Sequence, residues 1–136
     1  MTYALSAALQ ASVYQKLSND GSVTGLVGDE IYDALPGGSL PETFISLGSE
    51  QVRDASDKTA NGAIHRIDVT VRTQKPGFVE AKRIAVAVSD ALHNADLNMD
   101  RGRLVYLRFL RAQARRLDQS AGREIQMQFS ARVDDD

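Results

Sequence analysis

The sequence predicts an α+β protein, with an antiparallel-rich sheet of four to five strands and two main helices packed on one face. Two observations carry this prediction. Apolar residues recur at helical spacing in residues 2–17 and 78–92, and they alternate with polar residues in several other segments. The predicted order is one helix, three strands, a second helix and two strands. With 136 residues, 43% of them hydrophobic, the chain suits a single domain, residues 1–136, that holds its own core.

The N-terminal third predicts one amphipathic helix followed by weaker elements. The helix has an apolar residue at every fourth position: Leu5, Leu9, Val13 and Leu17. The Asn-Asp-Gly run at 19–21 ends it, because glycine readily adopts the left-handed backbone found just past helices. Residues 23–27 fit one further helical turn, residues 30–33 fit a short strand, and residues 43–47 fit a strand buried on both faces.

A polar segment, residues 48–62, comes next. We expect a long polar loop here, and loops of this length in compact domains are usually functional or mobile. The pair Asn61-Gly62 is a turn signal that ends the loop. The chain then alternates apolar and polar residues from 65 to 73, which predicts a half-buried strand.

The C-terminal half predicts a second helix, residues 78–92, and a long hairpin. Apolar residues three and four positions apart give the helix a stripe that must pack on a sheet or another helix. The hairpin joins residues 103–115 to residues 125–133 across a turn at 118–122, and its second strand alternates strictly. The apolar pattern changes face near Phe109, which predicts a bulge in the first strand.

The composition excludes several kinds of chemistry. The chain contains no cysteine and two histidines, which rules out disulfides, cysteine nucleophiles and thiolate zinc sites. It contains no G-x-S-x-G motif, and its glycine-rich segment at 21–28 follows a helix and matches no phosphate-binding motif. No segment approaches the ~20 apolar residues of a membrane helix. We therefore expect no enzymatic activity, no cofactor, no metal and no membrane contact.

The charges are distributed unevenly along the chain. Residues 1–50 carry one lysine against six carboxylates, a net charge of −5, whereas residues 101–123 carry seven arginines against one aspartate, a net charge of +6. Three aspartates at 134–136 predict a solvated acidic tail. Three interpretations of the asymmetry stay open: neutralisation within the molecule, head-to-tail contact between subunits, and contact with DNA phosphates.

Several short patterns occur in a characteristic order. An arginine–aspartate step at Arg53-Asp54 and a lysine–threonine step at Lys58-Thr59 precede a glycine and a strand-opening histidine, His65. Further matching pieces are Val27-Gly28, Ile31-Tyr32, Pro36, Gly62, Gly77, Ala81-Lys82, Asp90-Ala91-Leu92-His93, the late arginine-rich strand and Phe129-Ser130-Ala131. In order and spacing, these pieces resemble the tail completion (tail terminator) proteins of long-tailed, siphovirus-like bacteriophages and phage-derived gene transfer agents, over nearly the whole chain.

The resemblance implies a structural virion protein without catalytic activity. Members of that family are small α+β subunits, assembled in the host bacterial cytoplasm, that form a hexameric ring at the head-proximal end of the tail tube. The ring ends tube polymerisation and joins the tail to the head connector (stopper). The implied partners are further copies of the chain, the tail tube protein and the connector protein, with DNA passing through the ring lumen without specific binding.

We expect the contact residues in the polar loop and in the arginine-rich strand. They are Arg53, Asp54, Asp57 and Lys58 in the loop, and Arg108, Arg111, Arg115 and Arg116 in the strand. Loops and exposed charged strands carry such contacts because a rigid scaffold holds them in place. Two alternatives remain: a head–tail connector or stopper-like subunit, and a small DNA-binding module that uses the arginine-rich strand.

Overall fold

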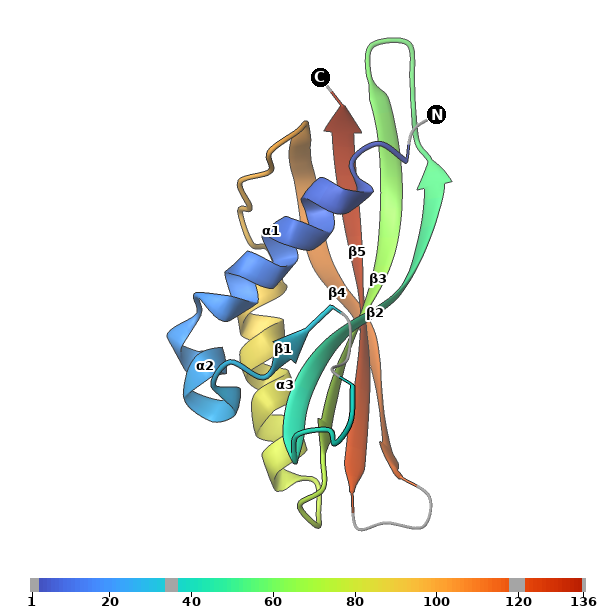
Figure 1. Ribbon diagram of the computed structural model, residues 1–136. Coiled ribbons are helices and arrows are strands. Elements are labelled where there is room, and N and C mark those ends of the chain that lie inside the picture. The colour runs from blue at the N-terminus through green and yellow to red at the C-terminus, as the bar shows by residue number, and fades with distance from the viewer. Residues whose placement is uncertain (1–2, 34–36, 118–121, 136) are drawn as a thin grey trace.

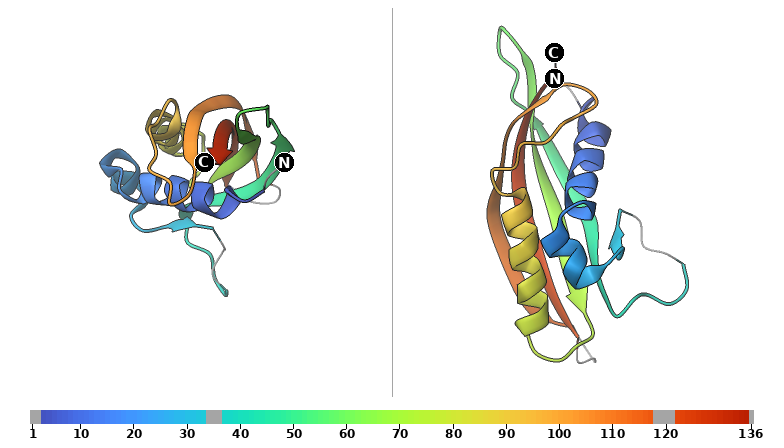
Figure 2. Two further views of the ribbon diagram at one scale, coloured as in Figure 1. Left: turned by 90° about the horizontal axis from the view of Figure 1, so that it is seen from above. Right: turned by 90° about the vertical axis from the view of Figure 1, so that its left-hand side faces the viewer.

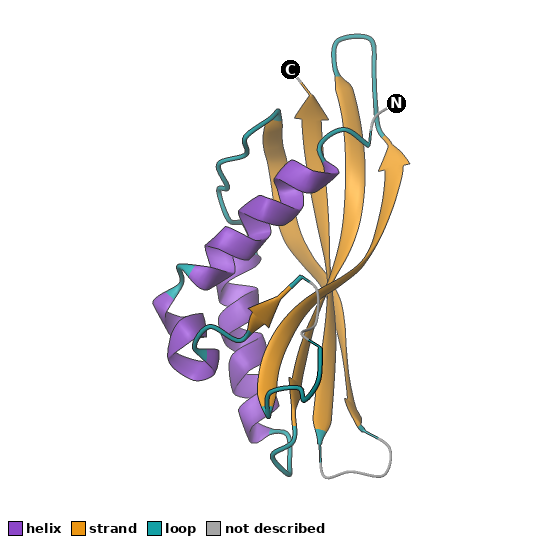
Figure 3. Cartoon of the chain, viewed as in Figure 1, coloured by secondary structure: helices purple, strands orange, loops and turns teal. Residues whose placement is uncertain are grey.

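The computed structural model describes residues 3–33, 37–117 and 122–135, and Figures 1 and 3 show its architecture. The elements follow in the order α1 (Ser6–Ser18), α2 (Gly21–Val27), β1 (Ile31–Tyr32), β2 (Thr43–Asp54), β3 (Asn61–Thr73), α3 (Val79–Leu92), β4 (Arg103–Arg116) and β5 (Arg123–Asp135). Most of the turn predicted at 118–122, and the last residue of the predicted tail, lie outside the described residues.

The strands form one five-stranded sheet in the order β1-β2-β3-β5-β4. The pair β1–β2 is parallel and the other three pairs are antiparallel. The helices lie on one side of the sheet, where α3 packs against β3, β4 and β5 (Figures 1 and 2). The α+β fold with helices on one face is therefore confirmed, with α2 as a short third helix.

The helices form where the apolar spacing predicts them. The buried residues of α1 include Leu9, Val13 and Leu17, which form its inner stripe. The side chain of Asp20 caps α2 by accepting hydrogen bonds from the backbone N–H groups of Ser22 and Val23, at 3.0 and 3.1 Å. The stripe of α3 is buried throughout and consists of Ala81, Ile84, Ala87, Val88, Ala91 and Leu92. These stripes and the inner face of the sheet form one core.

The strictly alternating β5 lies inside the sheet, between β3 and β4. Its alternate residues Ile125, Met127 and Phe129 face the helices and are almost fully buried. In β3 they lie opposite Val71, Val69 and Ile67, respectively. The register of β4 against β5 shifts between Phe109 and Arg111, so the predicted bulge is confirmed, and a second shift occurs between Leu104 and Tyr106.

The predicted loop at 48–62 is wrong in its extent. Strand β2 continues to Asp54 and β3 begins at Asn61, so residues 55–60 alone connect the two strands. The segment is polar because one face of this hairpin is not covered by helices, and a register shift between Leu47 and Glu50 obscures the alternation.

The predicted acidic tail is also incorrect where the structure describes it. Strand β5 includes Asp134 and Asp135. Asp134 is only 7% exposed, and its Oδ2 lies 3.1 Å from Nη2 of Arg103. Asp135 pairs with Arg101 at 2.7 Å. These carboxylates therefore neutralise arginines at the start of β4. Within the described residues, the structure contains no helix long and apolar enough to cross a membrane.

Candidate assembly surfaces

One face of the sheet has no helix over it, and we call it the open face. Directly paired residues of an antiparallel sheet point to the same side, so the register identifies which side chains share this face. Its charged members in the strands are the arginines Arg53, Arg66, Arg72, Arg103, Arg108, Arg111, Arg115 and Arg132 and the carboxylates Asp68, Glu124 and Asp134. With eight arginines against three carboxylates, the open face is strongly positive.

Glu124 is the most tightly held carboxylate on the open face. Its side chain is 7% exposed and lies between two arginines, accepting hydrogen bonds from Arg72 and, at 2.9 Å, from Nε of Arg115. Burial alone raises the pKa of a carboxylate, but the hydrogen bonds and charges of these two arginines outweigh it and hold the pKa of Glu124 below its ordinary value. The cluster joins β3, β5 and β4 at one end of the sheet.

The structure brings four of the predicted contact arginines onto the open face: Arg53, Arg108, Arg111 and Arg115. The guanidinium carbon of Arg108 lies 3.8 Å from the ring centre of Tyr106, which is a close cation–π contact. Arg116 pairs with Arg123 in the ladder and therefore points to the other side of the sheet.

Asp57 and Lys58 lie in the connection at the tip of the β2–β3 hairpin, which reaches beyond the end of β5 (Figure 1). Arg53 and Asp54 are the last residues of β2 and pair with Ile64 and Ala63. Asp57 shapes this tip: its Oδ1 accepts hydrogen bonds from the backbone N–H of Thr59 at 2.8 Å and of Ala60 at 3.0 Å. These bonds lower the pKa of Asp57. Asp54 accepts a hydrogen bond from the Ser56 hydroxyl at 2.6 Å, which likewise lowers the pKa of Asp54.

The hairpin tip and the far end of the arginine-rich strand lie at opposite ends of the sheet. The hairpin tip adjoins the end of the sheet where Leu104 of β4 pairs with Val133, whereas Arg115 pairs with Glu124. Nine positions of β5 separate these two rows, which is about 30 Å at 3.3 Å per residue. The connection at the hairpin tip is therefore far from Arg115, whereas Arg53 shares the open face with Arg108, two rows away along β5.

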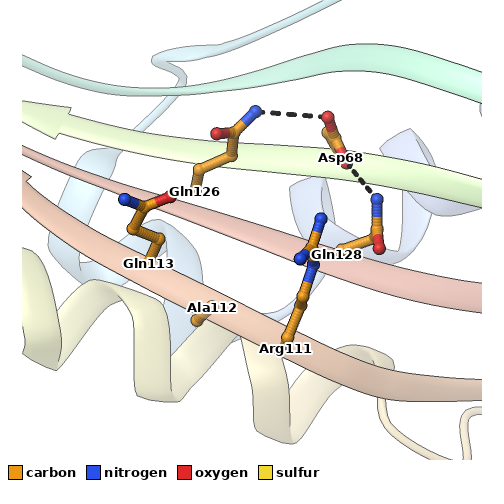
Figure 4. Close-up of a pocket in the computed structure, with 6 residues that line it drawn as sticks. All are labelled: Asp68, Arg111, Ala112, Gln113, Gln126 and Gln128. Carbon is orange, nitrogen blue, oxygen red and sulfur yellow. Dashed lines mark hydrogen bonds between the residues drawn. The ribbon is translucent and has the colours of Figure 1, made fainter.

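A polar depression of about 340 Å³ lies on the open face (Figure 4). At its edge, the carboxylate of Asp68 accepts hydrogen bonds from the side-chain amides of Gln126 and Gln128, at 3.2 and 3.3 Å. Arg111, Ala112 and Gln113 complete the lining. Both amides hydrogen-bond to the only carboxylate in this lining. The lining contains no hydroxyl, thiol or imidazole group that could act as a nucleophile or a base.

Both histidines serve the fold. His65 is fully buried, with Nδ1 3.0 Å from a carboxylate oxygen of Glu50. Nδ1 of His93 accepts a hydrogen bond from the backbone N–H of Phe109 at 3.0 Å. Among residues 3–33, 37–117 and 122–135, no group of three or more histidine or acidic side chains could hold a metal ion. In the part of the chain that is described, charged surfaces are thus the prominent features.

Sequence reasoning missed Arg66, Arg72, Arg103 and Arg132 as members of the same surface. The signal was present in part, because the alternation of residues 65–73 assigns Arg66 and Arg72 to the polar side of their strand. What joins them to Arg111 and Arg115 is the order of the strands in the sheet, which alternation alone does not reveal.

Comparison with known proteins agrees with this arrangement. No curated protein sequence is significantly similar to the chain. A chain in the solved structure of the virion of a native gene transfer agent (GTA) particle is 53% identical; the match covers 98% of this chain and 99% of that one, with a TM-score of 0.92. Residues 11–134 match the family model described as tail completion protein gp17. The chain therefore belongs to the tail completion protein gp17 family and is a structural tail protein.

Proposed function

We propose that the protein is a tail terminator subunit. In this proposal, copies of the chain form a ring at the head-proximal end of the tail tube, stop the tube from growing, and present a surface to the head connector. DNA passes through the lumen without specific binding. The observation that carries the proposal is the family match over residues 11–134, in a subunit whose described surface offers charged contact regions and no reactive cleft.

The charge distribution supports a closed ring, for which we propose six subunits. Strand β1 belongs to the acidic part of the sequence and forms one edge of the sheet, whereas the arginine-rich β4 forms the opposite edge. When two different surfaces of one subunit are complementary, each copy can bind the next in the same way, and the series closes if the rotation allows it. Opposed charges also favour encounter and correct register.

Within this proposal, the hairpin tip contacts the tail tube or a neighbouring subunit. Arg53 and Lys58 are exposed there, whereas Asp54 and Asp57 accept the hydrogen bonds that shape the tip. Arg53 and Lys58 are therefore the two predicted residues best suited to bind a partner directly. Individual surface ion pairs contribute only ~0–1 kcal/mol, so apolar contacts must accompany them.

The test uses tailed particles assembled with and without the protein. Without it, we expect tails of uncontrolled length that are not joined to heads, and addition of the purified protein should restore joining. The double variant Arg53→Ala/Lys58→Ala should unfold at the wild-type temperature but fail to restore tail length. Lys75→Ala, at an exposed position after the far end of β3, is the matched control. Tails of normal length, joined to heads, in particles without the protein would refute the terminator function.

One observation favours a second candidate, a DNA-binding module: the eight arginines on the open face. An electrophoretic shift assay across salt concentration decides this question. If this face contacts phosphates, DNA binding is tight and weakens as salt is added. The logarithm of the binding constant then falls with the logarithm of the salt concentration, with a slope of about −0.9 per neutralised phosphate. The terminator proposal expects weak binding, with no loss of tail capping when Arg66, which is exposed on the open face, is changed to glutamine.

A further inference from the structure

The edge of the sheet formed by β4 is only partly covered. Among the strands that the structure describes, β4 pairs with β5 alone. The turn after α3 covers its outer edge at two points, where Asn94 N–H donates to the carbonyl of Leu107 and Phe109 N–H donates to His93. From Leu110 to Arg116 every residue is exposed. An exposed edge of this length readily pairs with another chain unless something covers it.

An apolar groove runs beside this edge, between β4 and the outer side of α3. Its volume is about 340 Å³. The lining residues are Lys82, Ala85, Val86, Ser89, Phe109, Ala112, Ala114, Ile125 and Met127. Val86 is 59% exposed, and Leu110, on the bulge beside the groove, is 42% exposed. Large apolar side chains gathered in this way typically mark an interaction surface.

A surface of different character lies at the opposite side of the molecule, on the outer face of α1. Here the exposed residues Ala7 and Ala11 form a shallow, open hollow of about 650 Å³ between Tyr3 and Tyr14. The carboxylate residue Asp33, which follows β1, lines the same hollow. Two further exposed carboxylates, Asp29 and Glu42, come from the same acidic part of the chain. The side chains of Ala7 and Ala11 are small, so the backbone of another chain can approach α1 closely.

We propose that the groove and edge of β4 receive the outer face of α1 from a second copy of this chain. The inference rests on the proposed ring and names its subunit interface. A second copy is the occupant because one chain carries both complementary halves. Lys82 lines the apolar groove and Arg116 of β4 points to the same side of the sheet, whereas Asp33 lines the alanine-rich hollow. The groove adjoins the edge strand β4, and Asp33 follows β1, the strand at the opposite edge. Such a contact is heterologous and repeats from copy to copy.

The absence of cysteine from the chain makes cross-linking a direct test. The double variant Ala11→Cys/Leu110→Cys places one thiol on each half of the proposed interface, both at exposed positions. Treatment of assembled particles with a short bis-maleimide should give a ladder of covalent multimers that ends at a closed ring. The matched control Ala11→Cys/Gln126→Cys, with its second thiol on the open face, should give none. If Leu110→Cys prevents folding, Ala114→Cys serves in its place.

A mixing experiment tests whether the contact is head-to-tail. Val86→Glu disrupts the groove beside β4, and Ala11→Glu disrupts the outer face of α1. Each variant alone should be incorporated into particles about tenfold less than wild type, which corresponds to a loss of ~1.4 kcal/mol in the free energy of subunit association. Mixed together, the two should form 1:1 pairs and no larger species, because each retains one intact half.

The outcomes separate this inference from the terminator function. If the cysteine variants reach tail ends normally and give no ladder of cross-linked multimers, the proposed interface is refuted and the terminator function is retained. A ladder from the open-face control, together with none from the 11/110 pair, also overturns the interface. A wild-type protein that never reaches tail ends overturns both.

Discussion

His65 and Glu50 pair inside the β2–β3 hairpin, with Nδ1 of the histidine 3.0 Å from Oε2 of the carboxylate. The histidine is fully buried and the Glu50 side chain is 19% exposed. The same carboxylate accepts hydrogen bonds from the hydroxyls of Tyr3 and Ser6, each at 2.8 Å, at the start of α1. Glu50 therefore ties the first helix to the middle of the sheet.

The variant Glu50→Gln should lower the free energy of unfolding by ~1–3 kcal/mol, because it leaves a buried histidine and two hydroxyls with a weaker acceptor. The effect should show in denaturant unfolding at neutral pH. Asp96→Asn, at an exposed loop position, is the control and should change stability little. Equal stability of the two variants would contradict the anchoring role.

Stability should also depend on pH through Glu50. Burial opposes ionisation, but the hydrogen bonds from His65, Ser6 and Tyr3 outweigh it and lower the pKa of Glu50 below 4.5. A carboxyl group with a lowered pKa contributes stability that is complete above its ordinary pKa and is lost as the pH falls through the folded-state value. Unfolding measured from neutral pH to below 4.5 should show a decline that is shallower in Glu50→Gln than in the wild type.

Removing the charge of Glu124 should destabilise the open face. In Glu124→Gln, Arg72 and Arg115 lose the carboxylate between them, so we expect a loss of ~1–3 kcal/mol. Because the remaining arginines repel one another, added salt should recover part of the loss by screening. Urea unfolding at low and high salt measures both effects, with Asp90→Asn on the exposed side of α3 as the control. A variant that salt leaves unchanged would argue against repulsion between the arginines.

Gly102 occupies a position that no other residue fits. Its φ is +66°, and a Cβ there would lie 2.6 Å from the backbone oxygen of Asp134 and 2.7 Å from a methyl group of Leu5. Gly102→Ala should therefore cost ~1–3 kcal/mol. Gly25→Ala, within α2 where the added methyl meets nothing, should instead stabilise by about 0.5–1 kcal/mol. Opposite shifts in the melting temperatures of these two variants check the prediction.

The acceptor role of Asp57 predicts a difference between two substitutions at the hairpin tip. Asp57→Ala removes the oxygen that holds the backbone N–H groups of Thr59 and Ala60, and their hydrogen exchange should become faster. Asp57→Asn retains a side-chain carbonyl and should preserve most of the protection. Identical exchange in both variants would show that the tip is held by other contacts.

The sequence predicted the helices and the strands of the C-terminal half because their patterns depend only on one face being buried. The stripe of α3 and the alternation of β5 are local properties of the chain. The segment 48–62 was harder to interpret, because Gln51 and Arg53 point to the open face and make a paired strand as polar as a loop. The register shift after Leu47 removed the remaining alternation.

For the candidate surfaces, the sequence predicts which charges each strand carries but not how the strands lie next to one another. The arginine excess in β4 is visible in the sequence, but its position opposite the acidic edge depends on the strand order β1-β2-β3-β5-β4. Likewise, the sequence predicts a contact residue at Asp57 and a solvated tail at Asp134, and only the structure shows the backbone amides and the arginine that these carboxylates bind.

By itself, the sequence determined the α+β class, the amphipathic helices, the charge asymmetry and the absence of cysteine chemistry. The tertiary structure alone decided which arginines share the open face, which carboxylates they hold, and which edge stays uncovered. The physical reason is that hydrophobic periodicity is set by neighbours along the chain, whereas strand order and register bring together residues that are far apart in sequence. Their pairing is chosen by the burial of the whole core.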